Sequence, residues 1–107
     1  MIQLNESDFA ETVFTKPEKL FIVQFTATWC SVCEEFQPIL DKLEVKFGKT
    51  VDFVKIDVDE CPILADQYTI DTLTTFLMLK NQEIIDCIVG AESFNQFKDK
   101  INEALVK

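Results

Sequence analysis

Two cysteines, Cys30 and Cys33, stand three residues apart in the segment FTATWCSVC. Two thiols at this spacing can form a redox-active pair, contribute to a metal site, or persist as an inactive remnant. A buried apolar run precedes them and a helical pattern follows, so Cys30 should stand where a helix starts. Unpaired N–H groups and the helix dipole favour a thiolate there. Cys30 can then attack a disulfide, and Cys33, one turn further on the same face, can attack the mixed disulfide that results.

Three further residues bear on this chemistry. Trp29 precedes the pair and offers a docking peptide a flat apolar surface. The other cysteines, Cys61 and Cys87, are unevenly spaced and are predicted to be small core or semi-exposed residues. Four cysteines are too few to staple a secreted scaffold, so the close pair is expected to work in a reducing compartment.

Composition narrows the function further. Nineteen acidic residues against ten lysines, without arginine or histidine, give a net charge of −9. This charge argues against nucleic-acid partners and anionic membranes, which need a basic face. The missing histidines remove the usual general base and the commonest metal ligand. The acidic run Asp57, Asp59 and Glu60 is predicted to be a solvated turn, with no metal bound.

Length and hydropathy suggest one domain spanning residues 1–107. The chain has 107 residues, 48% of them hydrophobic, which is enough for one core and too little for two ordinary domains. The first residues do not show the basic start followed by an apolar run that is typical of a secretory signal. No apolar run approaches the roughly 20 residues of a membrane span. We expect a cytoplasmic monomer.

The apolar pattern changes period along the chain. Short, mostly apolar runs predict strands, and apolar positions three or four apart predict helices. After a first short strand, Asn5 should cap a helix, and Ser93 with Gln96 has the capping-box pattern of another. The remaining strands are predicted at residues 20–25, 51–58, 74–80 and 83–89, and the remaining helices at 32–47, 61–68 and 94–105. This order predicts an α/β fold, with a mixed sheet of about five strands flanked by about four helices.

Over nearly its whole length the chain resembles the thioredoxin family. The resemblance rests on FTATWCSVC, Pro38 in the following helix, VKIDVDE, YTIDTLTTFLMLKNQE and VGAESFNQFKDKINEAL, in family-like order and spacing. It implies a thioredoxin-like fold and a cytosolic protein-disulfide reductase. A thioredoxin reductase would supply electrons from NADPH, disulfide-containing proteins would be the clients, and no bound cofactor is expected. Cys30 would attack, Cys33 would resolve, and a Cys30–Cys33 disulfide would form in each cycle.

The sequence departs from the family at the position of a buried aspartate. The family buries an aspartate that helps deprotonate the resolving cysteine, and Gln24 stands at that position. Glutamine cannot take up a proton at any relevant pH. Lys55 matches a lysine that often accompanies this aspartate in the family, so the lysine is retained without its partner. We hypothesise that Lys55 favours the Cys33 thiolate; the alternative is a stem packed on the sheet with its amino group reaching water.

Two other departures surround the thiols. Ser31 and Val32 replace the usual Gly-Pro between the cysteines, which alters the helix start and the hydrogen bonds offered to sulfur. Thr74 replaces the cis-proline that faces the pair. A cis bond before a non-proline residue costs about 3–4 kcal/mol, so the Leu73–Thr74 bond is predicted to be trans, with an altered substrate groove.

Two alternatives to an oxidoreductase follow from these departures. One is a redox-inactive binding or scaffold module that uses the surface around Trp29. The other is a dimer that holds a metal ion or an iron–sulfur cluster through the same cysteines, because loss of the proline ring opens space beside the sulfurs. A tetrahedral site would need ligands from a second subunit or from outside thiols.

Overall fold

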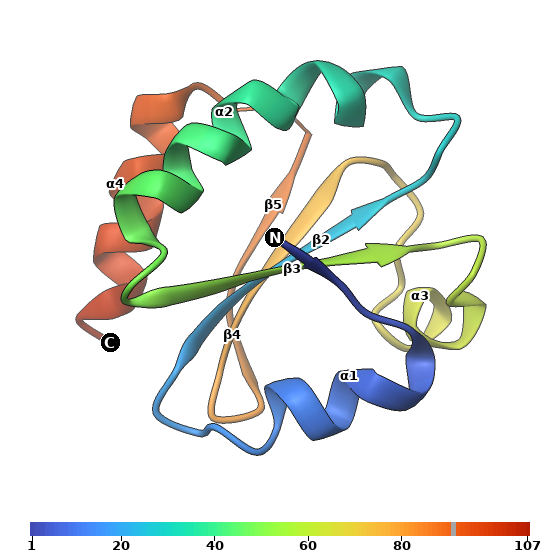
Figure 1. Cartoon of the computed structure of the whole chain (residues 1–107), viewed down its shortest axis with the longest axis horizontal. Helices are drawn as coiled ribbons and strands as arrows, with labels where there is room; N and C mark the ends of the chain where they lie inside the picture. The colour runs from blue at the N-terminus through green and yellow to red at the C-terminus, as the bar shows by residue number, and fades with distance from the viewer. Residues whose placement is uncertain (91) are drawn as a thin grey trace.

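One mixed five-stranded sheet, in the order β1-β3-β2-β4-β5, forms the centre of the molecule. The computed structural model describes residues 1–90 and 92–107. Two helices cover each face, α2 and α4 on one side and α1 and α3 on the other (Figure 1). The strands are β1 Ile2–Gln3, β2 Leu20–Thr26, β3 Val51–Asp57, β4 Thr75–Lys80 and β5 Glu83–Val89. The helices are α1 Glu6–Val13, α2 Ser31–Phe47, α3 Pro62–Gln67 and α4 Phe94–Leu105.

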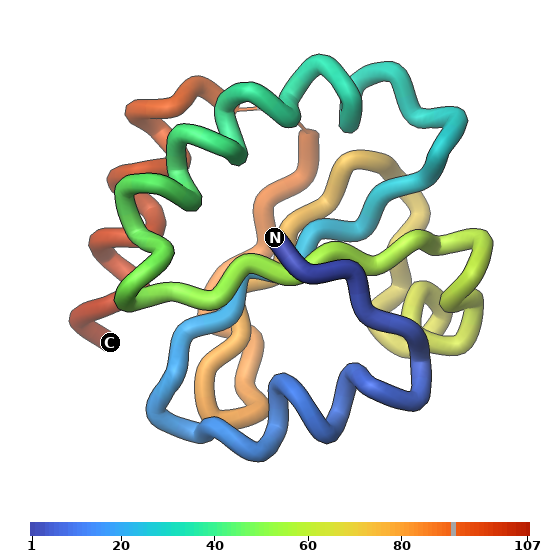
Figure 2. The backbone as a smooth tube through the Cα atoms, in the orientation of Figure 1, coloured from blue at the N-terminus to red at the C-terminus, as the bar shows by residue number. Residues whose placement is uncertain are grey.

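The predicted fold class and element order are confirmed. Strand β2 pairs in parallel with β3 and antiparallel with β4, while β1 lies parallel to the outer side of β3. The carboxyl ends of β2 and β3 therefore reach the same edge of the sheet, where α2 and α3 begin (Figure 2). None of the helices in the described part of the chain is both long and apolar enough to cross a membrane.

Strand β2 is buried on both faces, which explains its nearly unbroken apolar sequence. Leu20 and Ile22 face the helices α2 and α4. Phe21, Val23 and Phe25 face α1 and α3. Because β2 is held from both sides, the loop that follows it starts from a fixed point.

Three phenylalanines fasten α2 and α4 to the sheet. Phe36 of α2, Phe76 of β4 and Phe97 of α4 have ring centroids 5.0 to 5.9 Å apart, and all three side chains are buried. Edge-to-face and tilted aromatic contacts of this kind stabilise beyond the area they bury. Phe36 lies one turn after Cys33, so the cluster also fixes the first turns of α2.

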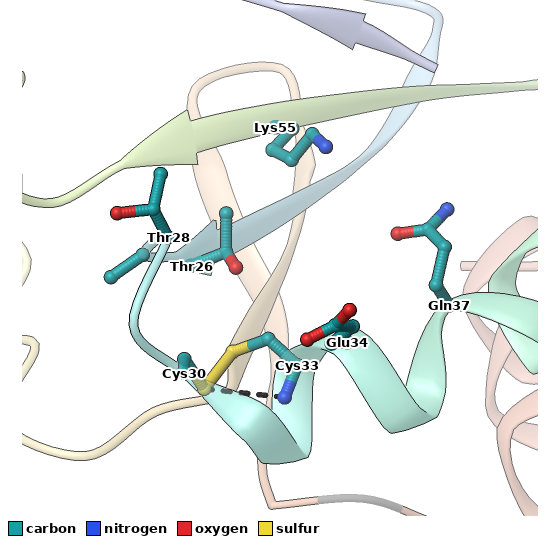
Figure 3. A pocket seen from close by; sticks show the side chains of 8 residues that line it. Thr26, Thr28, Cys30, Cys33, Glu34, Gln37 and Lys55 are labelled. Carbon is teal, nitrogen blue, oxygen red and sulfur yellow. Dashed lines mark hydrogen bonds between the residues drawn. A yellow bond between two sulfur atoms is a disulfide. The ribbon is translucent and has the colours of Figure 1, made fainter.

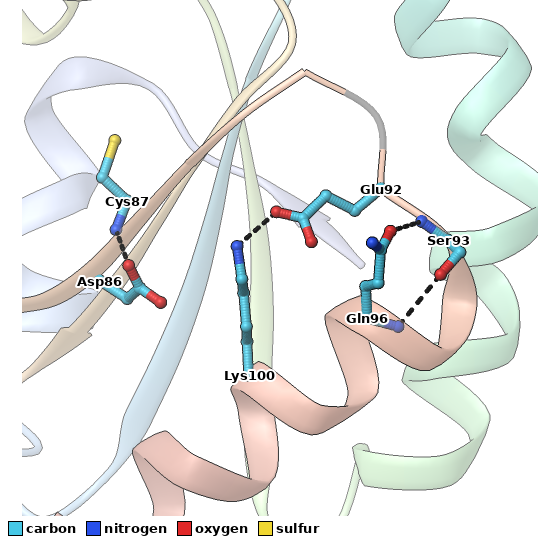
Figure 4. A network of polar contacts seen from close by, with 6 residues as sticks. All are labelled: Asp86, Cys87, Glu92, Ser93, Gln96 and Lys100. Atoms are coloured by element: carbon cyan, nitrogen blue, oxygen red, sulfur yellow. Dashed lines mark hydrogen bonds and ion pairs between the residues drawn. The ribbon is translucent and has the colours of Figure 1, made fainter.

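Local capping defines the ends of the helices, as the sequence predicted. The Asn5 side chain accepts a hydrogen bond from the Asp8 N–H at the start of α1. At α4 the Ser93 and Gln96 side chains each accept from the other residue's N–H (Figure 4). The predicted end of α2 is also confirmed, since Gly48 caps it.

The β4–β5 hairpin turns at Asn81 and Gln82, as predicted. Both residues have positive φ, 55° and 65°, the combination of a two-residue type I′ turn. Asparagine tolerates this conformation, whereas glutamine pays a steric penalty that glycine does not.

We therefore expect Gln82→Gly to raise the free energy of unfolding by about 0.5–1 kcal/mol in a urea titration. Asn102→Gly, in the exposed interior of α4, is the control and should lower it by about 0.3–0.5 kcal/mol, because glycine disfavours regular helix. A loss of stability in Gln82→Gly would contradict the prediction.

Candidate active site

The two cysteines of the WCSVC segment are joined by a disulfide. Their Cα atoms lie 5.3 Å apart, within the usual range for this bond. Cys30 is the N-cap of α2, and its Sγ accepts the backbone N–H of Cys33 at 3.2 Å (Figure 3). The structure thus places Cys30 at the start of a helix, as the sequence predicted.

The turn between β2 and α2 is set by backbone hydrogen bonds. The Cys30 N–H donates to the Ala27 carbonyl at 3.1 Å, and the Glu34 N–H donates to the Cys30 carbonyl at 3.2 Å. Beside the turn, the Val58 N–H donates to the Thr26 carbonyl at 2.9 Å, which ties the end of β3 to the end of β2. These bonds hold the first cysteine in register with the sheet.

Apolar side chains pack around the disulfide. Cys30 and Cys33 are 8% and 4% exposed and form a small cluster with Ala27, against which Val58 and Leu73 pack. Ser31 and Val32, between the cysteines, are exposed. The hydrogen bond to Cys30 Sγ comes from the backbone, so a donation from the Ser31 hydroxyl is not needed to explain it.

A hollow of about 310 Å³ lies beside the disulfide (Figure 3). It is lined by Thr26, Ala27, Thr28, Cys30, Cys33, Glu34, Gln37 and Lys55. Lys55 is half-buried on its wall, and Glu34 is exposed on the first turn of α2. The hollow brings one cation and one carboxylate to the cysteine pair. The proposed effect of Lys55 on Cys33 stays a prediction.

Gln24 and Thr74, two of the departures from the family pattern, contact each other. Gln24 is 1% exposed, and its Nε2 donates to Thr74 Oγ1 at 3.4 Å. The Thr74 hydroxyl in turn donates to the Phe25 carbonyl at 3.3 Å. The other amide atom, Gln24 Oε1, is buried without a hydrogen-bond partner in the described structure. Sequence reasoning missed this contact, because the two residues are separated by 50 positions.

The Leu73–Thr74 peptide bond is cis, so the prediction of a trans bond was wrong. That prediction weighed only the local preference of a non-proline bond. Thr74 is fully buried, its hydroxyl binds the Phe25 carbonyl, and its own carbonyl accepts the Gly90 N–H at 2.8 Å. These tertiary contacts define the backbone at this position.

Trp29 stands on the surface in a fixed orientation. Its side chain is 67% exposed, and the indole Nε1–H donates to Asp59 Oδ2 at 2.7 Å. Asp57 Oδ1 accepts the N–H groups of Asp59 and Glu60 at 2.8 and 3.3 Å. The prediction of a solvated turn was therefore wrong for Asp57, which is 7% exposed and organises the turn. Aspartate is favoured in turns because its side chain can accept the backbone N–H two residues further on, so Asp57 itself is the sequence signal for this Asx turn.

The other two cysteines lie elsewhere. Cys61 is buried in the core near α1 and α3, and Cys87 is exposed on β5. Burial raises the pKa of the Cys61 thiol, and the nearby Glu6 adds to this. Partial desolvation by its neighbours, and the adjacent Asp86, raise the pKa of the Cys87 thiol. Both thiols are therefore poorer nucleophiles than an ordinary cysteine near neutral pH.

Among residues 1–90 and 92–107, no group of three or more histidine, cysteine, aspartate or glutamate side chains is arranged to hold a metal ion.

Comparisons with known proteins agree with this geometry. The family model described as Thioredoxin matches residues 1–103. Thioredoxin H5 of Arabidopsis thaliana is 40% identical over 90 residues, which is 84% of this chain and 71% of that protein. Thioredoxin-1 of Caenorhabditis elegans is 33% identical over 98 residues, 92% and 84% of the two chains. Thioredoxin of Buchnera aphidicola is 31% identical over 103 residues, 96% and 94% of the two chains.

The Trp29–Asp59 contact yields a direct test. We expect Asp59→Ala to free the indole, because its only described hydrogen-bond acceptor is lost. The decay of fluorescence anisotropy should then gain a fast component, read without ambiguity since Trp29 is the single tryptophan. Asp66→Ala, on exposed α3, serves as the control and should leave the decay unchanged. An unchanged decay in Asp59→Ala would show that packing alone orients the ring.

Proposed function

We propose that Cys30 and Cys33 carry the reaction of this chain, which belongs to the thioredoxin family and is a thiol–disulfide oxidoreductase that reduces protein disulfides. The observation that supports their role is the disulfide at the start of α2, where Cys30 is the N-cap. The reduced protein is the reactive form. The disulfide is what remains after one cycle.

The cycle moves two electrons from the cysteine pair to the client. The Cys30 thiolate attacks one sulfur of a client disulfide, so a Cys30–client bond forms as the client S–S bond breaks and the second client sulfur leaves as a thiolate. The Cys33 thiolate then attacks Cys30 Sγ. The Cys30–Cys33 bond forms, and the first client sulfur leaves as a thiolate. Both client sulfurs take up protons from water.

Cys30 is assigned the attacking role because of its surroundings. It is the N-cap, its Sγ accepts the Cys33 N–H, and the exposed Trp29 precedes it. The N–H group and the helix dipole stabilise a negative sulfur at this position. Cys33 lies further inside the helix and is the less exposed of the two, so it is suited to act after the client is attached.

Removal of the proton from Cys33 is the step that differs from the family pattern. The buried Gln24 side chain does not ionise near neutral pH, so it cannot accept this proton. The hollow beside Cys33 holds Lys55 and Glu34 and is open to solvent. We assign the proton to water in this hollow, with Lys55 favouring the thiolate that remains.

The partners and place of action follow the family pattern. A thioredoxin reductase would return electrons from NADPH to the disulfide, and proteins with accessible disulfides would be the clients. No resident cofactor is needed, because the cysteine pair itself carries the electrons. A cycling dithiol suits a reducing compartment, so we place the protein in the cytoplasm and treat it as a monomer. The scaffold and metal-cluster alternatives are not favoured by the match to the family.

Substitution of each cysteine separates the two roles. With insulin as the disulfide substrate and dithiothreitol as the electron source, both Cys30→Ser and Cys33→Ser should lose turnover. In a single-turnover reaction of the reduced protein with insulin after dithiothreitol has been removed, only Cys33→Ser should accumulate a mixed disulfide, visible by mass spectrometry, because it retains the attacking thiol. Cys87→Ser, distant in sequence and on β5, is the control with full turnover. Accumulation in Cys30→Ser instead would reverse the assignment.

Replacing Gln24 tests the proton step. We expect Gln24→Asp to speed release of the mixed disulfide near neutral pH, about 10²-fold at most, because a carboxylate can take the Cys33 proton. Gln24→Asn has the same size without a basic group and should give no gain. Release is followed by single-turnover kinetics from pH 5 to 9. An equal rate in the Asp and Asn variants would show that another group or water already suffices.

A further inference from the structure

Charged residues are unevenly distributed between the two edges of the sheet. Exposed carboxylates lie where β2 and β3 end and α2 and α3 begin, which is the edge that carries the disulfide. Figure 1 shows these strand ends and helix starts. Glu34 lines the hollow beside the cysteines, Asp59 is bonded to Trp29, and Glu60 follows it on the same turn. Lys55 is the cation that lines this hollow.

The lysines concentrate at the opposite edge. Lys16 and Lys19, before β2, form ion pairs with Asp52 at the start of β3. Lys46 and Lys49 stand at the far end of α2 from the disulfide. Lys80, at the end of β4, donates to the Lys107 carbonyl. These lysines therefore lie away from the exposed carboxylates at the redox edge.

Two carboxylates near the site are paired or buried, so they do not belong to this group of exposed negative charges. Glu92 is paired with Lys100 (Figure 4), and Asp57 is buried with its Oδ1 bound to two backbone N–H groups. Glu34, Asp59 and Glu60, in contrast, are exposed. Asp59 is also held in place by the indole, so its charge is fixed relative to Trp29.

A partner must come close to these charges. The disulfide sulfurs belong to residues that are 8% and 4% exposed, so an incoming disulfide has to approach along the surface formed by Trp29 and Val32. Both of these side chains are exposed, at 67% and 42%. Charges within about 10 Å of one another are only partly screened at 0.1 M salt. The residues that flank a client's disulfide therefore experience this negative potential.

We propose that the surface made of Trp29, Val32, Glu34, Asp59 and Glu60 selects disulfide partners whose disulfide is flanked by basic residues. The inference rests on the proposed function of Cys30 and Cys33 and adds the class of partner. The apolar side chains contact the partner, and the carboxylates attract lysine or arginine beside its disulfide. A single-signed surface of this kind raises association rates for the opposite charge and lowers them for the same charge.

Three small disulfides of similar size test the proposal. Cystamine is cationic, 2-hydroxyethyl disulfide is neutral and 3,3′-dithiodipropionate is anionic near pH 7. The reduced protein is mixed with each in a stopped-flow instrument, and oxidation is followed by Trp29 fluorescence. Each rate constant is divided by that of dithiothreitol with the same disulfide, which removes differences in leaving-group pKa.

The expected result is a charge preference that salt removes. The corrected rate for cystamine should exceed that for the anionic disulfide by about tenfold or more at about 20 mM ionic strength, and by less than about threefold at 0.5 M. Equal corrected rates at low salt, or a preference that persists at 0.5 M, would overturn the surface proposal alone. No reaction with the neutral disulfide would overturn the proposed function and the partner class with it.

Two double variants locate the effect on the surface. Glu34→Gln with Glu60→Gln should reduce the corrected cystamine preference at least about twofold at low salt, because two of the nearby charges are gone. Glu18→Gln with Glu83→Gln makes the same change in net charge at the opposite edge and should leave the preference within experimental error. The preference is a ratio of rates, so a change in thiol reactivity cancels. Equal effects of the two double variants would assign the preference to net charge and overturn the proposal.

Discussion

Parallel pairing of β2 with β3 is the constraint on which the rest of the site depends. Because the two strands run in the same direction, both end at one edge, and the helix that follows each strand begins there. The same pairing brings the turn after β3 beside the turn after β2, where Val58 binds the Thr26 carbonyl and Asp59 binds Trp29. The parallel pairing thus places both the helix start at Cys30 and the turn that carries Asp59.

Gln24 and Thr74 are both buried, and neither side chain ionises near neutral pH. The Gln24 amide donates a hydrogen bond to the Thr74 hydroxyl, and this hydroxyl donates a hydrogen bond to the Phe25 carbonyl. This arrangement holds the cis segment before β4 against the central strand. In the proposed cycle, acid–base chemistry therefore uses the solvent-facing hollow lined by Lys55 and Glu34.

The sequence predicted the elements better than the contacts between them. Periodicity and caps located the strands, the hairpin turn at Asn81-Gln82 and the start of α2, because these depend on neighbours in the chain. The cysteine pair was found for the same reason. The contact of Gln24 with Thr74, the cis bond and the anchoring of Trp29 by Asp59 join segments 30 or more residues apart or depend on such segments. The local sequence pattern does not predict these features, so they could be identified only from the three-dimensional structure.

The four cysteines also differ in how they can meet one another. Four thiols allow several pairings, yet Cys61 is enclosed in the core on the α1 and α3 side and Cys87 stands on the outer strand of the sheet. Only Cys30 and Cys33 are brought together by a single helical turn, so closing their ring requires ordering very little chain. When the reduced chain is exposed to oxidant, the native pair should therefore close ahead of any mispaired form. The placement of the thiols therefore favours the native disulfide over the mispaired ones.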